Sequence, residues 1–161
     1  MDETPPSGVE IERKFLVDRP PAGLGEGEPI DQGYLVIGED GVEVRIRRRG
    51  ATATLTVKSG PGMVRTEEEF ELDERRFTSL WPLTEGRRVT KTRHVIPLGS
   101  GLAAELDVYS GAHDGLLTAE IEFPSLEASE AFQPPAWLSR EVTGDRRFAN
   151  QALALEGRPP H

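Results

Sequence analysis

The sequence predicts a β-dominated α+β domain in which eight strands form an antiparallel barrel or sandwich with a few short helices. Charged and apolar residues alternate with a period of two in eight short segments. Turn signals rich in glycine separate many of these segments, and only three stretches have the pattern of short helices. The 161 residues are enough for one domain with a buried core.

The elements are expected in a simple order along the chain. The strands should cover residues 9–16, 29–37, 42–49, 53–59, 64–72, 89–98, 103–109 and 117–123. The helices should cover residues 73–83, 125–132 and 145–155, the first two with Asp73 and Ser125 as caps. Residues 1–8 are expected to form a flexible leader, 9–156 the single domain and 157–161 a tail.

The charge balance limits the partners. A net charge of -9 argues against nucleic acid and anionic membranes, which are themselves polyanions. Some of the 19 Lys and Arg residues could still converge on one small anionic ligand. The protein is expected to be a monomer or a homodimer. The absence of cysteine excludes disulfides and thiolate metal sites. No signal-like segment or long apolar run occurs in the sequence, so a cytoplasmic location is expected.

Most charged residues fall on one face of the expected strands, because alternate residues of a strand point the same way. In chain order, this phase contains Glu10, Glu12, Lys14, Glu43, Arg45, Arg47, Lys58, Arg65, Glu67, Glu69, Lys91, Arg93, Glu105, Asp107, Glu120 and Glu122. The signs are sorted, because acidic pairs two residues apart recur on four strands and basic pairs on two.

Two interpretations of this face are possible. An ordinary antiparallel sheet with its charged face in water would explain the alternation. Alternatively, the face encloses a site, because paired carboxylates suit Mg²⁺ or Mn²⁺ and paired Arg or Lys side chains suit a phosphate chain. If the sheet closes, eight strands leave room inside for side chains and one small ligand, and the three helices would cover the apolar outer face.

The residues themselves resemble a known family. Glu10-Ile11-Glu12-Arg13-Lys14 matches the ExExK signature of the CYTH superfamily, the triphosphate tunnel metalloenzymes. The similarity runs from residue 9 to residue 155, through Gln32-Gly33-Tyr34-Leu35, Lys91-Thr92-Arg93 and Glu141-Val142-Thr143-Gly144-Asp145. The chain is most similar to the short bacterial inorganic triphosphatases. The resemblance implies a closed eight-stranded antiparallel β-barrel, the triphosphate tunnel, with a few flanking helices.

The resemblance and the charged phase together suggest roles for individual residues. The expected ligands of Mg²⁺ or Mn²⁺ are Glu10, Glu12 and Glu122, with Glu120, Asp107 and Glu105 as further candidates. The expected phosphate-binding residues are Lys14, Arg45, Arg47, Lys58, Arg65, Lys91 and Arg93. The expected catalytic residues are Lys14, Tyr34, Glu67 and Glu69.

Some of these assignments keep alternatives. Tyr34 could hydrogen-bond Lys14 across adjacent strands, or it could pack against the wall. Glu67, Glu69, Glu105 and Asp107 could hold a second metal, orient water or balance the basic wall.

The expected function is metal-dependent hydrolysis of a triphosphate, with inorganic tripolyphosphate as the expected substrate. A class IV-like adenylyl cyclase or a thiamine triphosphatase of the same fold is the first alternative. A non-catalytic module that binds polyphosphate or a nucleotide is the second. The carboxylates Glu10, Glu12 and Glu122 argue against the non-catalytic module, which has no need of metal ligands.

Overall fold

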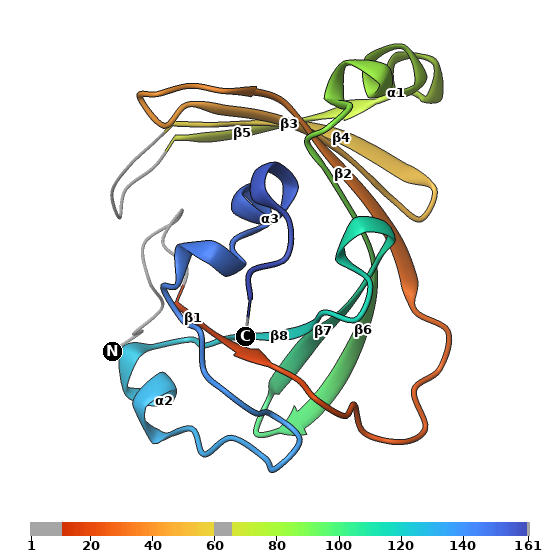
Figure 1. Ribbon diagram of the computed structural model, residues 1–161. Coiled ribbons are helices and arrows are strands. Elements are labelled where there is room, and N and C mark those ends of the chain that lie inside the picture. Colours follow the sequence, from red (N-terminus) through yellow and green to blue (C-terminus); the bar gives the residue numbers. More distant parts are fainter. Residues whose placement is uncertain (1–10, 60–65, 161) are drawn as a thin grey trace.

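The chain forms one curved antiparallel sheet of eight strands with short helices on both of its faces (Figure 1). A computed structural model describes residues 11–59 and 66–160. The strands are β1 (Glu12–Leu16), β2 (Glu28–Ile37), β3 (Glu43–Arg49), β4 (Thr52–Lys58), β5 (Glu67–Leu72), β6 (Arg88–Gly99), β7 (Leu102–Ser110) and β8 (Leu117–Glu122). Every expected strand segment is therefore confirmed within the described residues.

The helices are short. The α-helices are α1 (Glu74–Leu80), α2 (Leu126–Ala131) and α3 (Asn150–Glu156), and the 3₁₀ helices are η1 (Trp81–Thr84), η2 (Gly111–His113) and η3 (Arg146–Phe148). The expected caps are confirmed, because the side chains of Asp73 and Ser125 accept backbone N–H groups at the starts of α1 and α2. Among the described residues, no helix is long and apolar enough to cross a membrane.

The sheet is open, so the expected closed barrel is wrong. The strand order is β1-β8-β7-β6-β2-β3-β4-β5, which leaves β1 and β5 as the two ends of the sheet. The outer edge of β1 is already occupied by residues 139–143. In that segment Val142 N donates to Lys14 O at 2.8 Å, and Leu16 N donates to Arg140 O at 2.8 Å. These backbone bonds use the groups on β1 that a closing strand would need.

The opposite end of the sheet has the features of a protected edge. Strand β5 carries Glu67, Glu68, Glu69 and Glu71, and all four residues are exposed. Charged residues on an edge strand oppose pairing with another strand. Both ends of the sheet thus remain apart for identifiable reasons, one edge being covered by another segment and the other being acidic.

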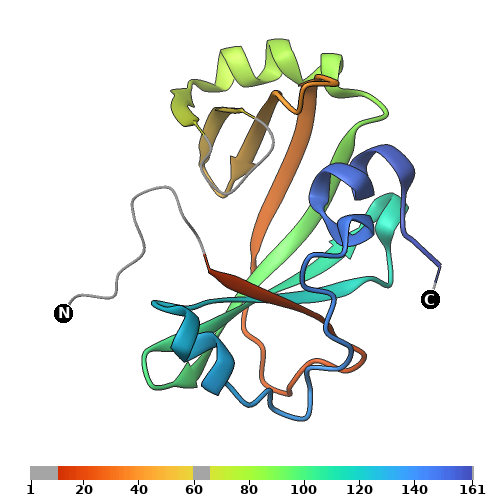
Figure 2. The same ribbon diagram turned by 90° about the vertical axis from the view of Figure 1, so that its left-hand side faces the viewer.

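Two helices cover the convex, outer face of the sheet, as expected. Helix α1 places Phe77 against Ile46 and Ala53 on the outer face of β3 and β4. Helix α2 and the residues after it cover β1, β7 and β8, where Leu106 and Ile121 are fully buried. Figure 2 shows α1 and α2 at opposite ends of the molecule.

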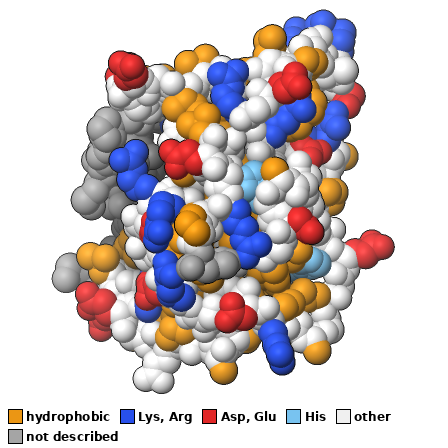
Figure 3. All heavy atoms as spheres, viewed as in Figure 1, with side chains coloured by type: hydrophobic (Ala, Val, Ile, Leu, Met, Phe, Trp, Pro, Cys, Tyr) orange, Lys and Arg blue, Asp and Glu red, His pale blue; other side chains and the backbone are white. Residues whose placement is uncertain are grey.

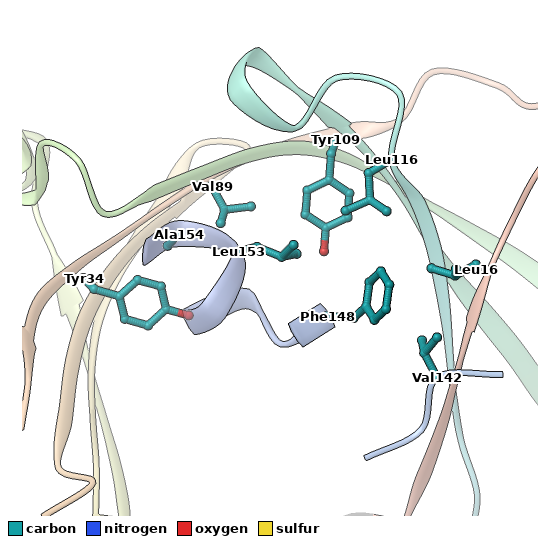
Figure 4. Packing of buried hydrophobic residues seen from close by; sticks show 9 residues of the cluster. All are labelled: Leu16, Tyr34, Val89, Tyr109, Leu116, Val142, Phe148, Leu153 and Ala154. Carbon is teal, nitrogen blue, oxygen red and sulfur yellow. The ribbon is translucent and has the colours of Figure 1, made fainter. Parts of the chain in front are cut away.

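The third helix corrects the expectation that all helices lie outside. Helix α3 sits within the curve of the sheet, on its concave face (Figure 1). Figure 4 shows Leu153 and Phe148 close to Tyr109 on the sheet, with Tyr34 on the other side of α3. These residues belong to one buried cluster, in which Leu153 is 0% exposed. The expected helix 145–155 is also divided, because Ala149 has extended backbone between η3 and α3.

Candidate active site

The strand register brings the charged phase together on the concave face. Residues directly opposite each other on neighbouring strands share a face. The cross-strand pairs include Glu12 with Glu122, Lys14 with Glu120, Glu105 with Glu120, Arg93 with Asp107, Arg45 with Thr56, Thr56 with Glu69, and Lys58 with Glu67. Lys91 is opposite Tyr109, and Arg45 is opposite Tyr34. Both tyrosines point toward α3, so the charged phase and α3 share the concave side (Figure 4).

The most buried part of this face is a compact ion cluster on β6 and β7. Arg93 donates two hydrogen bonds to the carboxylate of Asp107, from Nε at 2.8 Å and from Nη2 at 3.0 Å. Lys91 Nζ lies 2.8 Å from the same carboxylate, and Arg93 Nη1 lies 2.5 Å from Glu105 Oε2. Lys91 is 2% exposed and Asp107 is 1% exposed. Two cations therefore share one buried carboxylate.

Charge and burial act against each other in this cluster. Burial is the largest influence on Asp107 and by itself would raise the pKa, but the bonds from Arg93 and the charge of Lys91 hold the pKa below its ordinary value. Burial lowers the pKa of Lys91, and the attraction of Asp107 does not fully offset it. Asp107 is thus committed to two cations, which makes it a structural anchor of the basic wall and a poor candidate for a metal ligand.

A second basic group lies on β3 and extends the cationic surface. Arg45 Nη1 lies 3.7 Å from Glu43 Oε2, which is a long ion pair. The pKa of Arg47 is lowered, first by burial and then by the charges of Arg45, Arg93 and Arg49. The negative charge of Glu69 raises the pKa of Arg47, but it is the smallest of these influences. The protein thus holds several guanidinium groups close together at a cost in repulsion. The face of the molecule seen in Figure 3 carries Lys and Arg side chains across its middle, with Asp and Glu side chains between them. The guanidinium groups together favour an anion.

Lys14 lies at the other side of the concave face, on β1. Its Nζ donates to Phe148 O at 2.6 Å and lies 3.3 Å from Glu120 Oε1. The contact with Phe148 connects the sheet to η3. Lys58, on β4, lies 3.8 Å from Glu67 Oε1 on the edge strand.

The candidate metal ligands are only partly assembled. Glu12 and Glu122 are directly opposite each other and both are exposed, which places two like charges side by side. Glu120 follows on the same face of β8. Within the described residues, no three His, Asp or Glu side chains gather into a ready cation site. Glu10 lies outside these residues. The donor set offers only carboxylate oxygens, which suits a hard cation such as Mg²⁺ or Mn²⁺.

Tyr34 packs into the wall, and this was one of its two expected roles. Its hydroxyl accepts from Gln32 Nε2 at 2.9 Å. The other expected role required adjacent strands, but β8, β7 and β6 lie between β1 and β2. Burial, followed by the charge of Glu43, raises the pKa of Tyr34 to about 12. Tyr34 therefore keeps its proton at neutral pH and is no general base there.

Other expected site residues are less central. Glu67 and Glu69 are exposed on the edge strand β5, where Glu67 faces Lys58 and Glu69 faces Thr56. Arg65 lies outside the described residues. Glu105 is engaged with Arg93, as described above.

Helix α3 and η3 add residues to this face that sequence reasoning missed. Asn150 Oδ1 accepts from Tyr109 OH at 2.9 Å and lies 3.4 Å from Lys91 Nζ. The backbone oxygen of Phe148 binds Lys14. Strand alternation cannot identify such residues, because they lie outside the sheet. The only available signal was the capping residue Asp145, whose side chain accepts from Arg147 N and starts η3.

Comparison with known proteins places this arrangement in a family. No family model matches the chain. A curated inorganic triphosphatase from Nitrosomonas europaea is 47% identical over 147 residues, which cover 91% of this chain and 97% of the relative. A second one, from Acetivibrio thermocellus, is 36% identical over 149 residues, which cover 91% of this chain and 93% of the relative.

Solved structures agree with these relatives. A crystal structure of an inorganic triphosphatase matches with a TM-score of 0.79 at 44% identity, covering 94% of this chain and 97% of that one. A Hippeastrum protein described as having a dominant triphosphatase activity matches with a TM-score of 0.56 at 17% identity, covering 76% of this chain and 83% of that one. The second match shows the fold alone. The identity and coverage of the curated relatives show that this chain belongs to the inorganic triphosphatase family.

Proposed function

We propose that the chain hydrolyses inorganic tripolyphosphate to pyrophosphate and orthophosphate on the concave face of its sheet. The observation that carries the proposal is the placement of Arg45 and Arg47 on β3 and Arg93 on β6, on the same concave face; burial first, and then repulsion from Arg45, Arg93 and Arg49, lowers the pKa of Arg47. A bound polyanion would relieve that repulsion and accept guanidinium hydrogen bonds from both sides of β2. The names of the two curated relatives support the same substrate.

Hydrolysis needs positioning and charge neutralisation more than covalent chemistry. The basic residues on β3 and β6 would hold the phosphate chain, and Lys14 would act from β1. A water molecule would attack the terminal phosphorus, the P–O bond to the next phosphate would break, and the leaving pyrophosphate would take the electron pair. Tyr34, which keeps its proton, could donate a hydrogen bond but would not activate the water.

A divalent cation fits this arrangement in part. Glu12, Glu120 and Glu122 would hold Mg²⁺ or Mn²⁺ at one end of β1 and β8, together with Glu10. The support for this site is the cross-strand pairing of Glu12 with Glu122, which brings together two carboxylates, the oxygen donors that a hard divalent cation prefers. When bound, the metal would neutralise phosphate charge and make a coordinated water more acidic.

The buried aromatic residues favour an inorganic substrate over a nucleotide or thiamine compound. Tyr34 and Tyr109 are the two tyrosines of the chain, both point inward, and each is 1% exposed. Their rings pack in the cluster around α3 and are not available to stack on a base or a thiazole ring. The adenylyl cyclase and thiamine triphosphatase alternatives therefore lack support from these residues.

The metal site can be tested by phosphate release from tripolyphosphate at a fixed Mg²⁺ concentration. We expect Glu122→Gln to lower kcat/KM by more than about tenfold, since outer-shell changes alone commonly cost 10–100-fold at metal sites. Glu130→Gln, on the exposed side of α2, is the matched control and should leave the rate unchanged. Full activity in EDTA, or a Glu122→Gln variant as active as the wild type, would contradict the proposed metal site.

A further inference from the structure

The short segment Phe148–Asn150 contacts two of the basic residues on the concave face. Phe148 O accepts from Lys14 Nζ at 2.6 Å, and Asn150 Oδ1 lies 3.4 Å from Lys91 Nζ. Lys14 belongs to β1 and Lys91 to β6, so one segment of three residues reaches lysines on two different strands. Both contacts are made by neutral oxygen atoms.

The chemistry of the Asn150 contact is well defined. A lysine ammonium has only donors, so the amide atom that faces Lys91 must be the oxygen. The same oxygen accepts from Tyr109 OH at 2.9 Å, which fixes the orientation of the amide. A carbonyl oxygen has two lone pairs and can accept both bonds.

These contacts close off the lysine that lies deepest. Lys91 is 2% exposed, and it is surrounded by Asp107, Asn150 and the ring of Tyr109. Asp107 Oδ2 and Asn150 Oδ1 thus take two of the three donors of Lys91 Nζ, and of these two acceptors Asn150 is the neutral one. The segment itself is held by α3, where Leu153 is fully buried and its backbone oxygen lies 2.5 Å from His113 Nε2.

We infer that Phe148–Asn150 acts as an internal substitute for phosphate: Asn150 Oδ1 and Phe148 O occupy the positions on Lys91 and Lys14 that oxygens of the polyphosphate take. This inference rests on the proposed function. Charged phosphate oxygens are stronger acceptors than neutral carbonyl oxygens, so the substrate displaces the segment. Substrate binding then includes the free-energy cost of displacing the segment. The apparent Kd equals the intrinsic Kd divided by the fraction of molecules in which the segment is undocked.

Two substitutions of Asn150 should change the affinity for tripolyphosphate in opposite directions. Asn150→Ala removes the competing oxygen, so tripolyphosphate should bind about 3- to 10-fold more tightly. Asn150→Asp keeps the shape and places a charged oxygen against Lys91, so tripolyphosphate should bind more weakly. If Asn150 only supported the fold or positioned Lys91 for substrate, the Ala variant would bind more weakly, and the Asp variant would be the better tolerated of the two.

The experiment is a calorimetric measurement of the Kd for tripolyphosphate in EDTA, so that neither metal nor turnover contributes. Gln151→Ala, the next residue of α3, is the control and should keep the wild-type Kd. An Asn150→Ala variant with an unchanged or larger Kd would overturn the inference and leave the proposed function standing. Absence of binding by the wild type and by all variants, both in EDTA and with Mg²⁺, would overturn both.

Discussion

Tyr34 and Tyr109 show how strongly burial controls chemistry on the concave face. Each is 1% exposed. Burial is the largest cause that raises the pKa of both, to about 12 for Tyr34, and Asp107 adds to the effect on Tyr109. A folded-state pKa above the unfolded value contributes stability that is fully present below the unfolded pKa. That stability is lost as pH rises through the folded pKa.

We therefore expect the two tyrosines to remain protonated at pH 10, where an ordinary tyrosine is half ionised. Absorbance at 295 nm should stay flat up to about pH 11 in the native protein, since its two tyrosines are both buried. The free energy of unfolding should fall as pH rises from about 10 to 12. Protein in denaturant, which should titrate near pH 10, is the control. A native titration step near pH 10 with unchanged far-UV circular dichroism would contradict this account.

Arg47 should be needed for binding but not for folding. Its pKa is lowered by burial and by three neighbouring arginines, so its charge is unfavourable without a ligand. We expect Arg47→Gln to lower kcat/KM for tripolyphosphate by about 10- to 150-fold, which corresponds to the roughly 1.5–3 kcal/mol of a charged hydrogen bond. The melting temperature should stay the same or rise. Arg76→Gln, on exposed α1, is the control and should retain activity. A variant that loses stability and activity together would indicate a structural role.

For single residues, the sequence predicts which face of the sheet a side chain occupies, because this depends only on strand phase. Period-two alternation placed Arg45, Lys91 and Asp107 on one face, and the register confirms it. The specific partners could not be predicted, because they depend on register between distant strands. Asp107 is the example: it was a candidate metal ligand, yet it binds Arg93 and Lys91.

Helix α3 is the element whose position the sequence did not predict. Its apolar residues were expected to cover the outer face, but Leu153 packs inside the curve of the sheet. An amphipathic segment needs an apolar surface, and although alternation places Leu16, Val89 and Tyr109 in the charged phase, it does not show that they meet at one end of that face. The same limit explains the wrong expectation of closure. Backbone bonds from residues 139–143 to β1 come from an irregular segment without alternation.

The docking of α3 can be tested with two leucines of the same helix. Leu153 is 0% exposed and Leu155 is 49% exposed. We expect Leu153→Ala to lower the free energy of unfolding by about 2–5 kcal/mol, as for other buried leucines. Leu155→Ala should change it by less than about 0.5 kcal/mol, as for an ordinary surface substitution. Urea unfolding of both variants measures the difference. Equal losses for the two leucines would contradict the placement of α3.

At the scale of the whole molecule, the charge distribution matters more than its sum. The net charge is -9, which repels polyanions at a distance. A basic group made of Arg45, Arg47, Lys91 and Arg93 nevertheless lies on the concave face, and acidic residues cover the exposed edge strand β5. A molecule of this kind should accept a short polyanion in one place and reject long ones elsewhere. This arrangement fits a small inorganic substrate better than a nucleic acid.

The most direct test of the central claim is the rate and product of phosphate hydrolysis, followed by ³¹P nuclear magnetic resonance. Tripolyphosphate and ATP should be compared at equal concentration with Mg²⁺ or Mn²⁺. We expect tripolyphosphate to give pyrophosphate and orthophosphate in equal amounts, with a higher kcat/KM than ATP. Preference for ATP, formation of cyclic AMP, or no hydrolysis of tripolyphosphate with either metal would contradict the account.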